Sequence, residues 1–254
     1  MYGLIGKVLK HSYSKEIHTM LGNLDYKLFE LDELTFEEMI RKKEYQGLNI
    51  TIPYKIKVMD YLDVISEEAK SIGSVNTIVN KNGLLYGYNT DYYGFEYLIH
   101  LFDLSLSGKK VLVLGNGGAA KPVFYYLGKN NVQYVIVKSK KESGVITYSE
   151  ARKKHYDADV IINTSPVGMF PNINYSPMSL AGYDKLSLVI DMIANPIETK
   201  LMKEAREKGI KAIGGLELLV AQAKKSEELF KEIVIEEKAI TEITKKIEQI
   251  MSEQ

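Results

Sequence analysis

Apolar residues follow two spacings along the first hundred positions, and their alternation predicts strands interleaved with helices. Short apolar runs, typical of buried strands, occupy residues 2–7, 26–32 and 47–52. Between them, over residues 12–24 and 35–45, apolar side chains recur every three or four positions, as on one face of a helix. This pattern predicts an α/β fold in which a mainly parallel sheet is flanked by helices.

Local signals place the ends of the first two helices. Ser12 or Ser14 is a candidate N-cap for the first, and Gly22 stands where that helix should end. Thr35, with Glu38 three residues later, forms a capping-box pattern that predicts the start of the second. Two short amphipathic helices are therefore expected between the first three strands.

The following segment predicts a helix, a hairpin and another helix. The first helix is expected over residues 54–64. Residues 74–89 form two strand-like runs that meet at Asn82 and Gly83, a pair typical of a two-residue hairpin turn. Helical spacing returns over residues 91–102.

A polar, glycine-containing segment at residues 103–110 separates this block from a second alternating block. The tail from about Ser226 has apolar residues at helical spacing among paired charges, which favours a packed pair of amphipathic helices. We therefore expect two domains, one of residues 1–104 with 215–254, and the other of residues 105–214.

The strongest local signal is "VLVLGNGGAAKPVFYYL", in which a buried strand meets a glycine turn and then a helix. The turn has the G-x-G-x-x-A form of the dinucleotide-binding fingerprint. Gly115 permits the tight turn, Gly117 allows a pyrophosphate close to the backbone, and Ala120 lets helix and strand pack closely. The candidate phosphate-binding residues are Gly115, Asn116, Gly117, Gly118, Ala119 and Ala120. A turn that only joins strand to helix is the less favoured alternative.

The end of the next strand indicates which dinucleotide is bound. In NAD-binding proteins an acid about 20 residues after the loop holds the ribose 2′-hydroxyl. Here "YVIV" is followed by Lys138, Ser139, Lys140 and Lys141, and Glu142 comes later. Ammonium and hydroxyl groups attract a 2′-phosphate, so NADP is favoured over NAD; a solvated lysine cluster is the alternative. The connection after Lys138 has room for only a shortened crossover helix.

Composition excludes several classes of protein. The 33 basic and 33 acidic residues balance, so neither a nucleic acid nor a membrane surface is indicated as a partner. The absence of cysteine excludes disulfides and thiol catalysis, and the four histidines lack the spacing of a metal site, so no metal is assigned. No window approaches the ~20 apolar residues of a membrane span, and the start does not resemble a secretory signal. A soluble, cytoplasmic protein is expected.

Polar side chains gather where the strands of the first block end. The set comprises Ser12, Ser14, Asn49, Thr51, Lys55, Asn76, Asn89, Thr90 and Asp91. Singly, each has a structural explanation, such as N-caps for the serines and for Asp91. Together they supply hydroxyls, amides, one acid and one amine near the carboxyl ends of strands, which is the edge where ligands bind in open α/β sheets.

Taken together, these segments closely resemble the shikimate dehydrogenase family. The matching stretches, in the family's order, are "HSYS", "GLNITIPYK", "GSVNTIV", "GYNTDYYGF", "VLVLGNGGAA", "INTSPVGM", "DMIANP" and "GGLELLVAQA". The resemblance extends from Tyr2 to about Phe230, and the combination is far more specific than the glycine loop alone. The resemblance implies an NADP-dependent enzyme, a monomer or homodimer, that interconverts 3-dehydroshikimate and shikimate in aromatic amino-acid biosynthesis. Residues 1–104 and 215–254 would bind substrate, and residues 105–214 would be a Rossmann-like NADP-binding domain.

The resemblance also implies a role for each matching residue. Lys55 and Asp91 would be the catalytic pair, and Ser12 and Ser14 would bind the substrate carboxylate. Ring hydroxyls would be bound by Thr51, Asn76 and Gln222, with Asn49 nearby. The cofactor would contact the glycine loop together with Lys138, Ser139, Lys140, Thr164, Met192 and Gly215.

Two departures from the family pattern bear on function. Ala194 stands where the family commonly has a tyrosine of the closed active site, so substrate affinity or turnover is expected to differ. Lys138-Ser139-Lys140 replaces the usual asparagine–arginine–threonine clamp, and lysine lacks the planar fork of arginine. Two alternatives stay open: a quinate/shikimate dehydrogenase with relaxed cofactor use, and an NADP-binding regulatory homologue without turnover. Both serines of "HSYS" argue against the former, and the Lys55–Asp91 pair argues against the latter.

Overall fold

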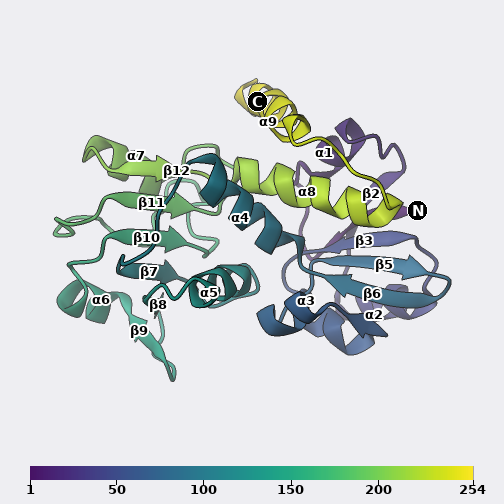
Figure 1. Cartoon of the computed structure of the whole chain (residues 1–254), viewed down its shortest axis with the longest axis horizontal. Coiled ribbons are helices and arrows are strands. Elements are labelled where there is room, and N and C mark those ends of the chain that lie inside the picture. The colour runs from purple at the N-terminus through teal and green to yellow at the C-terminus, as the bar shows by residue number, and fades with distance from the viewer. Residues whose placement is uncertain (254) are drawn as a thin grey trace. The chain divides into compact units, whose positions relative to one another are not determined.

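The computed structural model describes residues 1–253, which form two compact α/β units (Figure 1). One unit contains Met1–Tyr97 and the chain from Leu219 onward, and the other contains Leu98–Leu218. Both limits fall inside helices, α4 (Thr90–Leu101) and α8 (Leu216–Lys231), rather than in the polar segment 103–110. The expected boundaries lie within about two helical turns of these limits.

The first unit is built on a sheet in which one strand runs against the others. Its order is β2-β1-β3-β5-β6-β4. The strands are β1 (Tyr2–Gly6), β2 (Tyr26–Glu30), β3 (Gly47–Ile50), β4 (Val64–Ile65), β5 (Thr77–Lys81) and β6 (Leu84–Tyr88). β5 is antiparallel to both β3 and β6, whereas the remaining pairs are parallel. The β5–β6 hairpin turns at Asn82 and Gly83, which have φ of 52° and 85°, as the sequence predicts.

Successive side chains in these strands point to opposite faces of the sheet. One face packs against α2 (Glu33–Lys42) and α3 (Glu67–Ile72), in a core that includes Ile5, Phe36, Ile40, Leu48, Ile50, Ala69 and Ile78. The other face packs against α8, where Phe230 belongs to one hydrophobic cluster with Leu4, Tyr26 and Val79. Figure 1 shows α8 and α2 on opposite sides of the sheet. Because Asn49 alternates with Leu48 and Ile50, its amide is directed to the α8 side.

The first two helices form where predicted, but their caps differ. α1 (Ser14–Met20) is capped by Tyr13 without a side-chain hydrogen bond, so the serine caps are wrong. α2 starts two residues before Thr35, because Asp32 Oδ1 accepts from Thr35 N at 2.9 Å. A carboxylate acceptor at the N-terminus also interacts favourably with the helix dipole, which explains why Asp32 rather than Thr35 is the cap.

The helix expected over residues 54–64 is reduced to a short 3₁₀ helix, η1 (Lys57–Tyr61), followed by β4. The Lys55 carbonyl accepts from Val75 N at 2.8 Å, and Asp63 N donates to Leu85 O at 3.1 Å. These bonds to distant segments replace the i to i+4 bonds that an α-helix needs. The apolar spacing alone could not reveal that competition, nor the short helix α3.

The second unit has a fully parallel sheet of order β12-β11-β10-β7-β8-β9. The strands are β7 (Val111–Leu114), β8 (Tyr134–Lys138), β9 (Val145–Thr147), β10 (Val160–Asn163), β11 (Leu188–Asp191) and β12 (Lys211–Ile213). In chain order this is the strand arrangement of a Rossmann fold. Its helices are α5 (Ala120–Lys129), α6 (Tyr148–Lys154) and α7 (Lys200–Glu207). The shortened crossover is confirmed as the seven-residue α6.

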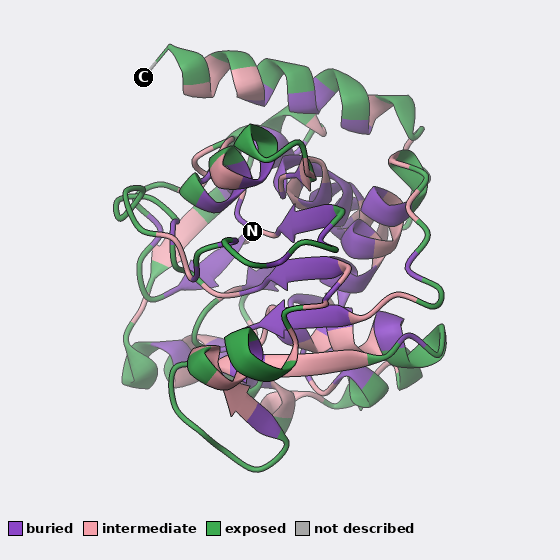
Figure 2. Cartoon of the chain, turned by 90° about the vertical axis from the view of Figure 1, so that its left-hand side faces the viewer, coloured by how far each residue is buried: buried purple, intermediate pink, exposed green. Residues whose placement is uncertain are grey.

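Burial follows the sequence pattern in both units (Figure 2). The central strands β7, β10 and β11 are buried throughout, which explains their continuous apolar runs. The tail forms the end of α8 and a separate amphipathic helix, α9 (Lys238–Ser252), which buries Ile240, Ile243 and Ile247. The predicted helix pair is therefore confirmed, although α8 begins ten residues earlier, at Leu216, in the "LELLVA" core stretch.

Candidate active site

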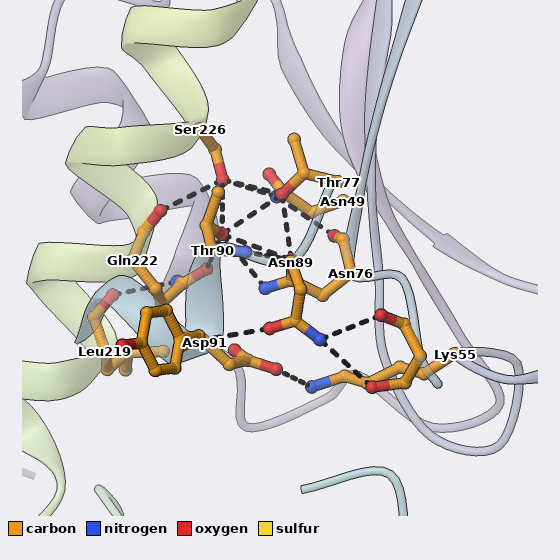
Figure 3. A network of polar contacts seen from close by, with 12 residues as sticks. Asn49, Lys55, Asn76, Thr77, Asn89, Thr90, Asp91, Leu219, Gln222 and Ser226 are labelled. Carbon is orange, nitrogen blue, oxygen red and sulfur yellow. Dashed lines mark hydrogen bonds and ion pairs between the residues drawn. The ribbon is translucent and has the colours of Figure 1, made fainter. Parts of the chain in front are cut away.

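A lysine and an aspartate form an ion pair beside the polar residues of the first unit (Figure 3). Lys55 Nζ donates to Asp91 Oδ2 at 2.6 Å, and the two side chains are 13% and 11% exposed. Partial burial strengthens this attraction because less water screens the charges. The remaining exposure leaves both groups accessible to a small ligand.

Strand direction brings both residues to one edge of the sheet. Lys55 follows β3 and Asp91 follows β6, and these strands run the same way because each is antiparallel to β5 between them. Asn76 precedes β5, whose amino end reaches this edge because the strand is reversed. The expectation that these polar residues follow the carboxyl ends of strands is therefore wrong for Asn76, which precedes the amino end of β5. Asn76 still lies at the same edge of the sheet as Lys55 and Asp91.

Asn89 caps α4, so the cap interpretation of Asp91 is wrong. Asn89 Oδ1 accepts from Tyr92 N at 3.1 Å, and Asn89 Nδ2 donates to the carbonyl and hydroxyl oxygens of Ser74 at 2.9 and 3.0 Å. With the helix end already capped, the Asp91 carboxylate is directed to Lys55 instead.

A buried hydrogen-bond network lies beside the ion pair (Figure 3). Its members are Asn49, Asn76, Thr77, Thr90, Gln222 and Ser226, all buried. Asn76 Nδ2 donates to Thr90 Oγ1 at 3.0 Å, and Thr90 Oγ1 lies 3.4 Å from Gln222 Oε1. The structure thus joins Asn76 and Gln222, which are far apart in the sequence, through the residue that precedes Asp91.

The Asn49 amide is committed to this network. Its Nδ2 donates to Thr77 Oγ1 at 3.0 Å and to Ser226 Oγ at 2.8 Å, and its Oδ1 accepts from Tyr26 Oη at 2.7 Å. A polar residue at this strand position is stable because its buried groups all find partners. The amide in the apolar run of β3 is thereby explained by its contacts with α8 and the neighbouring strand.

The other polar tips lie at the ends of β1 and β3. Ser12 Oγ donates to Ser14 Oγ at 3.1 Å, so the two serines are held together. Thr51 follows β3, where its N donates to Ile5 O at 2.9 Å, and its methyl group packs against Gly6.

Sequence reasoning missed two members of the network, Thr77 and Ser226. Ser226 lies one helical turn after Gln222 and therefore on the same face of α8. Thr77 is the register partner of Asn49 in the β3–β5 pair, so both side chains lie on the α8 side of the sheet. Both could have been suggested by these spacings once Asn49 and Gln222 were singled out.

In the second unit the glycine turn combines a position that requires glycine with one that leaves open space. Gly115 has φ of 111°, and a Cβ there would lie 2.8 Å from Thr164 Oγ1, so the protein itself requires this glycine. At Gly117 a Cβ would meet no atom within 4 Å. Its lack of a side chain therefore keeps space open outside the protein. Helix α5 has no side-chain N-cap, which leaves its first N–H groups for an anion.

The charged end of β8 is already partly paired. Lys138 Nζ donates to Glu142 Oε1 at 2.6 Å across an exposed turn, whereas Ser139 and Lys140 are exposed. An exposed pair of this kind contributes little to stability. Lys138 can therefore exchange its partner for another anion at small cost.

The remaining residues expected near a cofactor lie along adjacent strand ends of the same unit. Thr164 Oγ1 donates to Leu114 O at 2.8 Å, next to the glycine turn. Gly215 approaches the main chain of Met192 so closely that a Cβ would lie 2.3 Å from the Met192 oxygen. The structure thus places Thr164 beside Gly115 and brings Met192 and Gly215 together.

Asp191, at the end of β11, is a buried acid that sequence reasoning did not single out. Its Oδ1 accepts from Asn163 Nδ2 at 3.0 Å and from Ile193 N at 3.2 Å, and its Oδ2 accepts from Thr199 Oγ1 at 2.7 Å. Burial disfavours the charged form more than these bonds favour it, and raises the pKa of Asp191 to about 6, from an ordinary value of 3.8.

We expect Asp191→Asn to change how stability depends on pH. The native state holds the Asp191 proton more tightly than the unfolded state, so the free energy of unfolding falls as pH rises from about 4 to 6. The shift corresponds to about 3 kcal/mol. Asparagine does not titrate, so unfolding in urea should show the difference, variant minus parent, rising by up to that amount between pH 4 and pH 7. A constant difference would contradict this account.

No group of three or more His, Cys, Asp or Glu side chains that could hold a metal ion occurs within residues 1–253. His18 is instead paired with Glu227, with 2.5 Å between His18 Nδ1 and Glu227 Oε1, and its ring stacks on Tyr26. Over the same residues, none of the helices has the length and apolar character needed to cross a membrane.

Comparisons with known proteins agree on one family. The family described as "Shikimate dehydrogenase substrate binding domain" matches residues 4–78. A "Shikimate dehydrogenase (NADP(+))" of Clostridium beijerinckii is 40% identical over 253 residues, which cover 93% of this chain and 94% of the relative.

Solved structures give the same result over the full length. A chorismate mutase/shikimate 5-dehydrogenase fusion protein from Clostridium acetobutylicum has a TM-score of 0.91 at 38% identity, covering 100% of this chain and 98% of the other. Shikimate 5-dehydrogenase from Thermus thermophilus, in complex with NADP(H) and shikimate, has a TM-score of 0.83 at 25% identity, covering 96% and 98%.

Proposed function

The chain belongs to the shikimate dehydrogenase family, and we propose that it catalyses the NADP-dependent, reversible reduction of 3-dehydroshikimate to shikimate. The 2.6 Å contact between Lys55 Nζ and Asp91 Oδ2 carries the proposal, because it supplies a proton donor at a sheet edge built for ligands. Two relatives, from Clostridium beijerinckii and Clostridium perfringens, are named for the same activity.

Lys55 is proposed as the general acid and base. NADPH, when bound, supplies the hydride that reduces the ketone carbon. The alkoxide that forms needs a proton, which the Lys55 ammonium donates; in the reverse direction the neutral amine accepts the proton of the substrate hydroxyl. Asp91 accepts a hydrogen bond from Lys55 and so orients the amine, and its second oxygen can accept from a neighbouring substrate hydroxyl.

Substrate recognition is proposed to use the polar residues of the first unit. Ser12 and Ser14 would donate to the carboxylate, and Thr51, Asn76 and Gln222 would bind ring hydroxyls. The Asn49 amide is hydrogen-bonded to Thr77, Ser226 and Tyr26, so Asn49 would hold the substrate-binding side chains in place rather than contact the substrate. Sites of this kind reject analogues that lack a hydroxyl, because a buried polar group would lose its partner.

The second unit is proposed to bind NADP. The open space at Gly117 and the uncapped start of α5 fit a pyrophosphate, which Gly115 to Ala120 would hold. Lys138, Ser139 and Lys140 would contact the 2′-phosphate, and Thr164, Met192 and Gly215 would line the path towards the nicotinamide. On this assignment, substrate binding belongs to residues 1–104 and 215–254 and cofactor binding to residues 105–214, with Gly215, at the boundary, contributing to the cofactor path. A biosynthetic role of this kind supports a cytoplasmic location.

The experiment that tests this function follows nicotinamide absorbance with shikimate or quinate and with NADP or NAD. We expect oxidation of shikimate with NADP, and at least about tenfold lower kcat/KM with quinate. Comparable rates with both acids would favour the quinate/shikimate alternative. NADP binding without turnover of either acid would overturn the proposal in favour of a regulatory homologue. Ala194, which stands where the family commonly has an active-site tyrosine, is the feature that is compatible with this alternative.

A further inference from the structure

Three buried hydroxyl groups, those of Thr77, Thr90 and Ser226, form a triangle beside the ion pair (Figure 3). Their oxygens lie 3.1 Å apart for Thr77–Thr90, 3.0 Å for Thr77–Ser226 and 3.0 Å for Thr90–Ser226. They come from β5, the start of α4 and the middle of α8. This hydroxyl triangle therefore connects the strand that Asn76 directly precedes with the two helices that carry Asp91 and Gln222.

The hydrogen atoms of the network can be followed through the triangle. Amide hydrogens reach each oxygen, since Asn49 Nδ2 donates to Thr77 and Ser226 and Asn76 Nδ2 donates to Thr90. Each hydroxyl then keeps one hydrogen to donate. The acceptors outside the triangle are Asn76 Oδ1 and two oxygens of Gln222.

Ser226 makes four of these connections, and they join β3, β5, α4 and the backbone of α8. Its Oγ accepts from Asn49, donates to the Gln222 carbonyl oxygen at 3.0 Å, and contacts both threonine hydroxyls. Neither Asn76 nor Gln222 touches Ser226 through its side-chain amide. The serine acts on Asn76 through Thr77 and Thr90, and on Gln222 through Thr90 and the helix backbone.

The amides of Asn76 and Gln222 keep part of their capacity for a ligand. Asn76 gives one amide hydrogen to Thr90 Oγ1, and Gln222 gives one to Leu219 O at 2.8 Å. The second hydrogen of each NH₂ group is not used by these contacts. Because the triangle sets the rotation of both amides, it sets the direction of the hydrogens that remain.

We infer that Ser226 is a positioning residue that determines recognition of the substrate ring hydroxyls, through the hydroxyl triangle, without touching the substrate. The inference rests on the proposed function, in which Asn76 and Gln222 bind those hydroxyls. It goes beyond that function by assigning specificity to a residue outside the site. Buried polar networks of this kind are sensitive to the loss of one member, because the others lose their partners together.

The test compares Ser226→Ala with the parent enzyme on two substrates, shikimate and a shikimate analogue that lacks one of the two ring hydroxyls not oxidised. We expect kcat/KM for shikimate to fall about tenfold, mainly through KM, and kcat/KM for the deoxy analogue to change less than twofold. Discrimination between the two should therefore fall about fivefold or more. KM for NADP should not change.

Two further variants separate positioning from general damage. Thr77→Val removes another hydroxyl of the triangle at constant shape, and should also lower discrimination; it serves in place of Ser226→Ala if that variant does not fold. Thr244→Val removes a buried hydroxyl in α9 that has no hydrogen-bond partner in residues 1–253, and should leave discrimination as in the parent.

Equal losses on both substrates, or no loss on either, would show that Ser226 has only a structural role and would overturn the inference. The parent enzyme tests the proposed function in the same assay. If the parent does not oxidise shikimate, the proposed function is wrong. If the parent is active and both variants keep its discrimination between the two substrates, only the inference about Ser226 is wrong.

Discussion

Lys55→Met is expected to lower kcat for shikimate oxidation about a thousandfold, within the range that general acid–base groups contribute. Methionine keeps the length of the side chain but cannot accept the proton of the substrate hydroxyl. The Asp91 carboxylate, 11% exposed, also loses the ammonium partner that lies 2.6 Å away. Steady-state kinetics with NADP, together with circular dichroism to check folding, measures the effect.

Lys57→Met is the matched control for this variant. Lys57 lies two residues further along and is paired with Glu33 and Glu37 of α2, on the side of the sheet away from α8. Because this ion pair is not part of the proposed site, kcat should stay within about twofold of the parent, as exposed pairs contribute little. Turnover by Lys55→Met close to that of the control would remove Lys55 from the mechanism.

Gly117→Val is expected to weaken NADP binding at least about a hundredfold while leaving the protein folded. A Cβ at this position meets no protein atom within 4 Å, and φ is not in the positive region, so the side chain can start from this position without a backbone or Cβ clash. A pyrophosphate held against the turn would instead collide with the added methyl groups. Isothermal titration calorimetry with NADP, without substrate, measures the affinity directly.

Gly128→Ala provides the comparison for Gly117→Val. Gly128 lies in α5, is exposed, and also has open space at the position of a Cβ. There alanine should stabilise the helix by about 0.5–1 kcal/mol and leave NADP affinity unchanged. Equal affinity of the Gly117→Val variant and the parent would place the pyrophosphate elsewhere.

Several features of this protein could be predicted because they depend on neighbouring residues alone. The Asn82-Gly83 hairpin, the strand–turn–helix at Gly115 and the short α6 crossover follow from backbone preferences and chain length. The parallel order of the second sheet followed in the same way, because alternating strands and helices favour it, whereas its Rossmann-like character was implied by the family resemblance.

Errors arose where distant segments compete for the same groups. The helix expected over residues 54–64 yields to the bonds that Lys55 O and Asp63 N make with Val75 and Leu85. Asp91 looked like a helix cap because Asn89, which caps α4, could not be distinguished from it by sequence. In each case the local pattern correctly indicated a helical preference, but it did not identify the group that forms the hydrogen bond.

The sequence by itself identified the residues that are candidates for chemistry here: an amine at Lys55, an acid at Asp91 and a candidate phosphate-binding turn at Gly115 to Ala120. Only the tertiary structure decided that Lys55 and Asp91 meet, because their contact depends on the reversed direction of β5 between β3 and β6. It likewise decided that Ser226 joins Asn49 and Thr90, since residues so distant in the chain share a hydrogen-bond network only when α8 packs on the sheet. Local preferences act over a few residues, whereas these contacts exist only once the whole unit has folded.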